Sequence, residues 1–211
     1  MRATLPRHFC ALLGALLLFG LHFAGCAEMA YRHMNDPSRD AWQKPKDVIE
    51  TLHIKPGARV ADLGAGGGYF TWPLAEAVGA EGIVYAVEID ETALAMIGNE
   101  IKARGITNVV PIRADAHDAK LPEPVTLVFS CDTYHHMEDR AAYFRSLLRS
   151  LTPDGRVAIL DFHPHGLFSG FLGHGTDKTV VQREMESAGY WLSGDFTFID
   201  RQHFQVFAPK S

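Results

Sequence analysis

The chain has 211 residues, of which 47% are hydrophobic and 21% are charged, and this composition excludes a wholly disordered protein. The formal net charge of -5 argues against a general nucleic-acid or anionic-membrane binder, which would carry a basic excess. Three cysteines are too few for a disulfide scaffold or a four-cysteine zinc site.

The first 25 residues have the composition of an export signal. Arg2 and Arg7 precede an apolar run that extends from Phe9 to Gly25 and ends in small residues. This run is shorter than the roughly 20 apolar residues that a membrane-spanning helix needs. A charged start, a short apolar stretch and a small-residue end predict a signal peptide over residues 1–25.

Residues 23–26 read Phe-Ala-Gly-Cys, which resembles the lipobox of bacterial lipoproteins. The resemblance implies that Cys26 becomes the lipidated first residue of an exported, membrane-anchored protein that faces the periplasm. Two alternatives stay open. In the first, the segment is an uncleaved membrane anchor. In the second, translation starts at Met29 or Met34 and the protein is cytoplasmic.

A polar stretch over residues 26–46 is expected to be a linker or cap, and residues 47–211 to be the folded domain. Within that domain we expect helices at Asp47–His53, Phe70–Val78, Thr92–Arg104, Arg140–Leu151 and Thr179–Ala188. We expect strands at Arg59–Leu63, Ile83–Ile89, Val109–Ala114, Val125–Ser130, Arg156–Leu160, Tyr190–Asp195 and His203–Ala208.

Strands that alternate with helices indicate a parallel sheet covered on both faces. The last two strands are joined by too few residues for a crossover helix, so this pair should be antiparallel. The predicted fold is therefore α/β, a Rossmann-like doubly wound sheet of seven mainly parallel strands with the last strand antiparallel. The stretch from His163 to Asp177 is expected to be a long loop near the carboxyl ends of the strands.

The strongest motif lies between the first expected strand and the helix after it. Residues 62–68 read Asp-Leu-Gly-Ala-Gly-Gly-Gly, and glycines at this place let the backbone approach a ligand. A dinucleotide fingerprint would need Gly or Ala where Tyr69 stands. The pattern acid-x-Gly-x-Gly-x-Gly fits without a gap and resembles motif I of class I S-adenosylmethionine (SAM) methyltransferases.

Two acids follow at the spacing that this resemblance demands. Glu88 ends the second expected strand, where an acid accepts hydrogen bonds from both ribose hydroxyls of a nucleotide. Asp115 follows the third, and the matching family residue contacts the adenine amino group. The resemblance implies SAM as cofactor, and the cofactor-binding residues it implies are Asp62, Gly64, Ala65, Gly66, Gly68, Glu88, Ile89, Asp115 and Ala116.

The resemblance covers about residues 36–209 and is closest to small-molecule methyltransferases of the ubiquinone-biosynthesis type. It implies that the protein is an enzyme that transfers a methyl group to a small-molecule acceptor by in-line displacement. Residues 36–45 look like the entry segment of a bacterial subgroup. We expect this segment either to fold over the cofactor, with Trp42 as an apolar lid, or to cover the edge of the sheet.

The segment after the fourth expected strand, residues 130–139, would line the space between cofactor and acceptor. A general base is needed only if the acceptor atom carries a proton. Asp132, His135 and His136 are the candidate catalytic residues, because a histidine accepts a proton near neutral pH and a carboxylate orients it. Cys131 ends a buried strand and is interpreted as a small apolar residue rather than a nucleophile.

A metal site is considered and not predicted. Catechol-type methyltransferases place metal carboxylates where Asp132 and Asp161 stand, and His163, His165 and His174 lie nearby in the sequence. The asparagine that would complete such a site does not follow Asp161. Nucleic acid is also not predicted as substrate, since the proline-rich motif of base methylases is missing after the fourth strand.

An exported protein should meet little SAM, which is made in the cytoplasm. A non-catalytic binding or scaffold lipoprotein on a methyltransferase fold therefore remains the alternative function. A nicotinamide-dependent oxidoreductase is a more distant alternative, which Tyr69 disfavours.

Overall fold

The computed structural model describes residues 27–164 and 175–210 of the chain. In this part of the chain seven strands form one sheet with the order β3-β2-β1-β4-β5-β7-β6. The strands are β1 (Arg59–Leu63), β2 (Ile83–Glu88), β3 (Val109–Arg113), β4 (Val125–Cys131), β5 (Leu151–Phe162), β6 (Tyr190–Phe196) and β7 (Gln202–Pro209).

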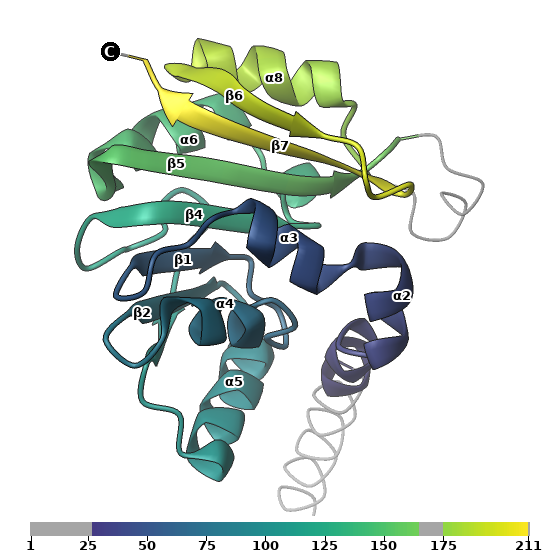
Figure 1. The fold of residues 1–211 in the computed structure, drawn as a ribbon, viewed down its shortest axis with the longest axis vertical. Helices are drawn as coiled ribbons and strands as arrows, with labels where there is room; N and C mark the ends of the chain where they lie inside the picture. The colour runs from purple at the N-terminus through teal and green to yellow at the C-terminus, as the bar shows by residue number, and fades with distance from the viewer. Residues whose placement is uncertain (1–26, 165–174, 211) are drawn as a thin grey trace, which may run out of the picture.

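Strands β1 to β5 run parallel to one another, and β7 is antiparallel to both β5 and β6 (Figure 1). The predicted doubly wound sheet with an antiparallel last strand is therefore confirmed. The strand order reverses between β1 and β4. In open α/β sheets a ligand binds in the crevice at the carboxyl ends of the strands beside such a reversal.

The helical elements of the described chain are mostly short. The chain is helical at residues 27–34. The elements that follow are η1 (Pro37–Arg39), α2 (Asp40–Gln43), α3 (Pro45–Thr51), α4 (Thr71–Val78), α5 (Glu91–Arg104), η2 (Tyr134–His136), α6 (Arg140–Leu147), η3 (Leu148–Ser150) and α8 (Lys178–Ser187).

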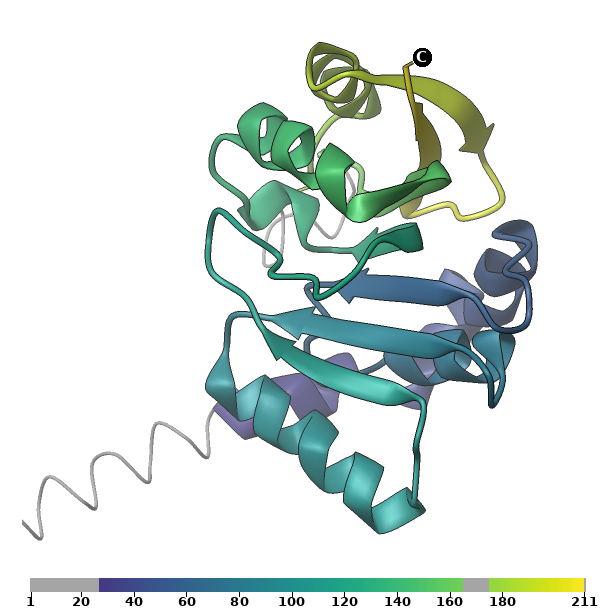
Figure 2. The same ribbon diagram turned by 90° about the vertical axis from the view of Figure 1, so that its left-hand side faces the viewer.

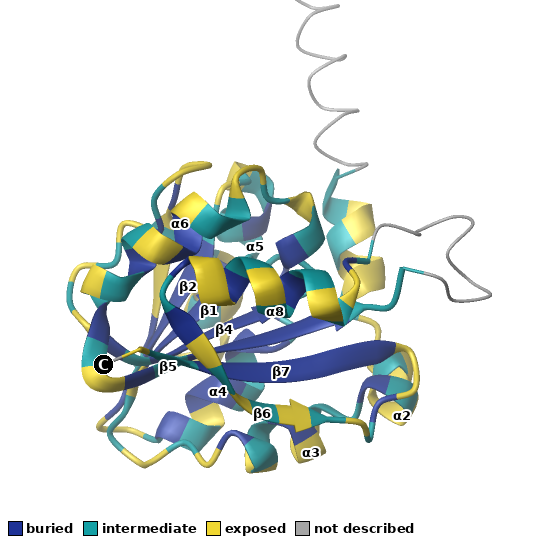
Figure 3. Ribbon diagram, turned by 90° about the horizontal axis from the view of Figure 1, so that it is seen from above, coloured by how far each residue is buried: buried dark blue, intermediate teal, exposed yellow. Residues whose placement is uncertain are grey.

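The sheet is covered on both faces, as the turned view of Figure 2 shows. Apolar side chains of α3, α4 and α5 pack on one face, and those of α6 and α8 pack on the other. Strand β7 is almost wholly buried, whereas α8 turns an exposed polar face outward (Figure 3). Burial of apolar surface on both faces stabilises the sheet and holds the strand ends in fixed positions.

Some element boundaries differ from the predictions. The helix expected to reach Leu151 ends at Leu147, and β5 begins five residues before the predicted Arg156. The reason is tertiary, because Leu151 pairs with Val125 of β4 and a register shift follows between Val125 and Leu127. The expected linker over residues 26–46 contains helical turns in its described part.

The predicted signal peptide and the lipidation site Cys26 lie outside the described residues, as does most of the loop after His163. Within residues 27–164 and 175–210, no helix is both long enough and apolar enough to cross a membrane.

Candidate cofactor and acceptor site

The glycine loop turns between β1 and α4 in a conformation that favours glycine. Gly64, Gly66 and Gly68 have φ angles of 76°, 52° and 96°. A Cβ atom at Gly64 would lie 2.1 Å from Thr133 Oγ1, and one at Gly68 would lie 2.9 Å from the Trp72 ring. A side chain at these places would therefore have to displace its neighbours as well as strain the backbone.

Glu88 stands beside this loop at the end of β2. Its Oε2 accepts a hydrogen bond from the Gly66 N–H at 2.9 Å, and its Oε1 accepts from the N–H groups of Ile89 and Asp90 at 2.7 and 3.0 Å. These bonds hold the carboxylate at the mouth of the loop. A carboxylate offers about four lone-pair sites, so it can still accept a ribose hydroxyl.

Asp62 is buried beneath the glycine loop and is not exposed on the side where the cofactor is expected. Its side chain is buried and accepts a hydrogen bond from Thr71 Oγ1 at 2.6 Å, which ties the end of β1 to the start of α4. Burial raises the pKa of Asp62 to about 7, and the bond from Thr71 opposes that rise. Asp62, the acid of the motif, thus stabilises the glycine loop by joining the strand before it to the helix after it.

The residues expected around the adenine ring lie at the ends of β2 and β3. Ile89 is an exposed apolar side chain beside Glu88, and Ala116 is exposed as well. Asp115 accepts the His117 N–H at 3.0 Å and pairs with Lys120 Nζ at 3.0 Å, and these bonds lower its pKa. Since β2 and β3 are paired, these side chains share one rim of the sheet.

Asp132 begins the loop after β4 with a positive φ of 54°. Its Oδ2 lies 3.3 Å from Arg39 Nη2, and its Oδ1 accepts a hydrogen bond from Gln202 Nε2. Burial raises the pKa of Asp132 to about 6, while the Arg39 guanidinium acts in the opposite direction. Asp132 therefore joins β4 to the segment before α3 and to β7.

The two candidate histidines differ in their surroundings. The His135 side chain is 7% exposed, and its Nδ1 lies 2.6 Å from Oδ1 of Asp161, which is fully buried. The Thr176 N–H donates to the other oxygen of Asp161 at 3.2 Å, which fixes the carboxylate. His136 is exposed, and its ring centre lies 4.1 Å from that of His135.

The carboxylate that orients His135 is thus Asp161, not Asp132. When Nδ1–H donates to Asp161, the lone pair is on Nε2, which is the arrangement of a general base. Of the residues considered as metal ligands, His165 and His174 lie outside the described chain. Within the described ranges, no three His, Cys, Asp or Glu side chains gather into a possible metal site.

A family model described as a methyltransferase domain matches residues 60–155 of this chain, from β1 to the turn within β5. The match contains the glycine loop, Glu88, Asp115 and His135, which are the residues described above. Residues 60–155 are thus similar to methyltransferase domains.

A curated protein similar to this chain is the ubiquinone/menaquinone biosynthesis C-methyltransferase UbiE of Ectopseudomonas mendocina. It is 35% identical over 126 residues, which is 56% of this chain and 47% of the relative. The chain spans about half the length of the curated relatives it matches.

Solved structures share the fold of the methyltransferase domain and its flanking elements. A SAM-dependent methyltransferase from Aquifex aeolicus matches 85% of this chain and 97% of its own, with a TM-score of 0.78 and 23% identity. The magnesium protoporphyrin IX methyltransferase of Synechocystis, solved with bound SAH, matches 81% of this chain and 84% of its own, with a TM-score of 0.62 and 19% identity. At these identities the likeness establishes the fold.

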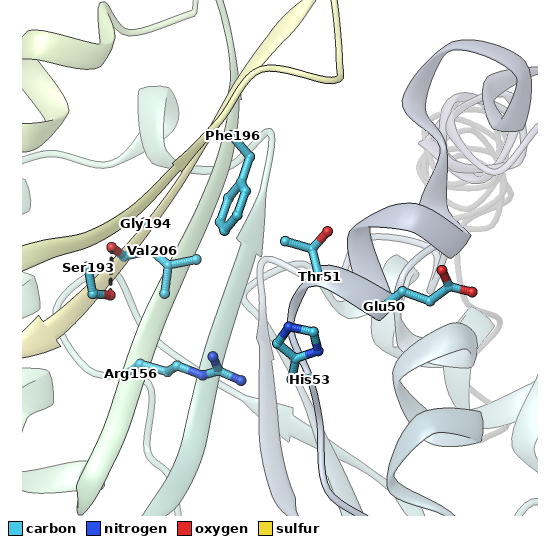
Figure 4. Close-up of a pocket in the computed structure, with 8 residues that line it drawn as sticks. All are labelled: Glu50, Thr51, His53, Arg156, Ser193, Gly194, Phe196 and Val206. Carbon is cyan, nitrogen blue, oxygen red and sulfur yellow. Dashed lines mark hydrogen bonds between the residues drawn. The ribbon is translucent and has the colours of Figure 1, made fainter.

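A cleft of about 420 Å³ lies elsewhere on the protein, and its lining residues all fall outside residues 60–155 (Figure 4). Its lining residues are Glu50, Thr51, His53, Arg156, Ser193, Gly194, Phe196 and Val206, none of which belongs to the predicted site. The Arg156 guanidinium donates a hydrogen bond to the Leu52 carbonyl oxygen beyond α3, and burial lowers its pKa. Arg156 therefore satisfies a carbonyl group at the carboxyl end of α3. We assign the cleft no part in methyl transfer.

Sequence reasoning missed several contacts around the site. Arg39, Gln43 and Gln202 surround Asp132, yet they come from segments far apart in the sequence. Trp42 does not lie on the glycine loop, since its ring stacks near Phe162 and Arg201. The density of polar residues in residues 36–45 was the one available signal.

Proposed function

We propose that the protein is a SAM-dependent methyltransferase that acts on a small-molecule acceptor. The observation that supports this proposal most directly is the position of the Glu88 carboxylate. Three backbone N–H groups hold it beside the glycine loop, within the residues that match the methyltransferase model. The residues fit SAM, because the loop leaves backbone free for close approach and Glu88 keeps capacity to accept the ribose hydroxyls. SAM supplies an activated methyl group on a sulfonium.

Within this function, His135 is the general base. Bound SAM would supply the methyl group for in-line transfer to the acceptor atom and would become S-adenosylhomocysteine (SAH), while His135 Nε2 would take the proton that the acceptor atom loses. Asp161 is a positioning residue, because its carboxylate fixes the imidazole through Nδ1. The acceptor is therefore an O–H, N–H or activated C–H group. The UbiE relatives act in ubiquinone and menaquinone biosynthesis, which favours a quinone-like acceptor.

This function is tested by SAH formation from SAM with a panel of hydroquinones and other phenols. His135→Asn keeps a donor for Asp161 but lacks Nε2, and we expect kcat to fall about 100-fold or more. The matched control His136→Asn should stay within about threefold of the parent. An unchanged rate in His135→Asn would remove the base role, and SAH binding without turnover on any acceptor would favour the non-catalytic alternative.

We also propose that Cys26 is lipidated and that it anchors the domain at the membrane facing the periplasm. The charged start, the short apolar run and the Phe-Ala-Gly-Cys sequence support this proposal. Metabolic labelling with a fatty-acid analogue should mark the full chain and fail on Cys26→Ser. Label-free protein in the soluble fraction would contradict it. The location requires that SAM reach that compartment.

A further inference from the structure

Residues 31–43, here called the strap, lie across the cofactor end of the sheet. Figure 1 shows α2 beside the end toward which β1 and β5 point. Asn35 Nδ2 donates to the Gly67 carbonyl at 2.6 Å, and the Tyr69 hydroxyl donates to Asp40 Oδ1 at 2.5 Å. The Tyr31 ring stands 3.8 Å from the Cβ position of Gly66. The strap thus touches the glycine loop at three places.

The strap also reaches Glu88, where the ribose is expected. Burial raises the pKa of the Tyr31 hydroxyl to about 12, and the nearby carboxylates of Glu88 and Asp90 act in the same direction. A cofactor that binds between the glycine loop and Glu88 therefore meets the strap.

Two strap residues meet Asp132 at the far side of the loop. Arg39 Nη2 lies 3.3 Å from Asp132 Oδ2 and its guanidinium covers the Tyr69 ring at 4.3 Å. Gln43 Nε2 lies 3.4 Å from the same oxygen and donates to Gln202 Oε1 at 3.1 Å. These contacts bridge the strap to β4 and β7.

The strap is held mainly by polar contacts. η1 has no buried residue and Gln43 is the buried residue of α2, whereas Val48 and Leu52 at α3 are fully buried. Opening the strap therefore breaks mainly polar contacts, together with the packing of the partly buried Tyr31 and Trp42 rings. Lys44 separates α2 from α3 with a positive φ of 52°, which marks a turn point between the loose and the anchored part.

We propose that the strap is a lid on the cofactor site, hinged at Lys44 and latched by Arg39 on Asp132. The inference rests on the proposed function, since the ligand is SAM or SAH. Bound cofactor adds contacts only to the closed lid and shifts the population toward it. The closed lid in turn slows cofactor release, and the lid leads directly to the segment that carries Cys26.

The test is hydrogen exchange of the full chain with and without SAH, together with the SAH dissociation rate. We expect exchange in residues 31–43 to slow about tenfold when SAH binds, and Arg39→Gln to raise the dissociation rate about tenfold. Lys46→Gln, at an exposed side chain beyond the hinge, is the matched control and should change neither.

Protection of the glycine loop by SAH without protection of residues 31–43 would overturn the lid and leave the methyltransferase intact. If the full chain does not bind SAH at all, the proposed function is wrong. If Arg39→Gln does not fold, the exchange of the parent chain alone decides.

Discussion

Replacement of Glu88 by Ala is expected to weaken SAM binding about 100-fold or more. A hydrogen bond to a charged group contributes about 1.5–3 kcal/mol, and Glu88 is placed to accept from both ribose hydroxyls. A loss of about 3 kcal/mol corresponds to roughly 100-fold in Kd. The measurement is calorimetric titration of the full chain with SAM and with SAH.

The Glu88→Ala experiment needs two further variants, because Glu88 also accepts hydrogen bonds from three backbone N–H groups. Glu88→Gln keeps one acceptor oxygen and should lose less affinity than Glu88→Ala. Glu91→Ala removes an equal charge from an 84% exposed side chain three residues on, and should bind within about twofold of the parent. Equal affinity in Glu88→Ala and Glu91→Ala would mean that SAM does not use Glu88.

Gly64→Ala is expected to destabilise the domain by about 3 kcal/mol or more and to abolish SAM binding. The new Cβ would meet Thr133 Oγ1 at 2.1 Å, and the φ of 76° is strained for any L side chain. Gly105→Ala is a matched control, because Gly105 has a φ of 64° with nothing within 4 Å of its Cβ position.

Thermal unfolding measures the difference between these two glycines. The control should cost about 1 kcal/mol from backbone strain alone, or about 3 °C in Tm. Gly64→Ala should lower Tm by about 10 °C. Equal losses in the two variants would show that Thr133 moves aside freely and that the loop is not tightly packed against the segment after β4.

The central fold could be predicted because local patterns carry it. Short apolar runs marked β1, β2 and β4, the glycine loop marked the end of β1, and Gly105, which has a left-handed conformation, marked the end of α5. The boundary of β5 was wrong because Leu151 pairs with Val125, a contact between strands that no local pattern encodes. Tertiary pairing therefore set the start of β5 at Leu151.

The residues of the candidate site also fall into those that local sequence patterns predict and those that only the fold brings together. The glycine loop and Glu88 follow from a strand–turn–helix pattern, in which sequence neighbours are also spatial neighbours. The sequence left His135 and His136 equivalent, and it offered Asp132 as the orienting carboxylate. Only the paired strands β4 and β5 bring Asp161 to His135, and only the return of the strap brings Arg39 to Asp132.

By itself, then, the sequence determined the α/β class, the cofactor loop and the acid that faces it, because these depend on spacing along one continuous segment. The tertiary structure decided that His135 lies against the buried Asp161 carboxylate, that Asp62 is buried under the glycine loop, and that the strap covers this loop. Those features depend on side chains from separate segments, and their meeting is set by strand order and by packing on the sheet.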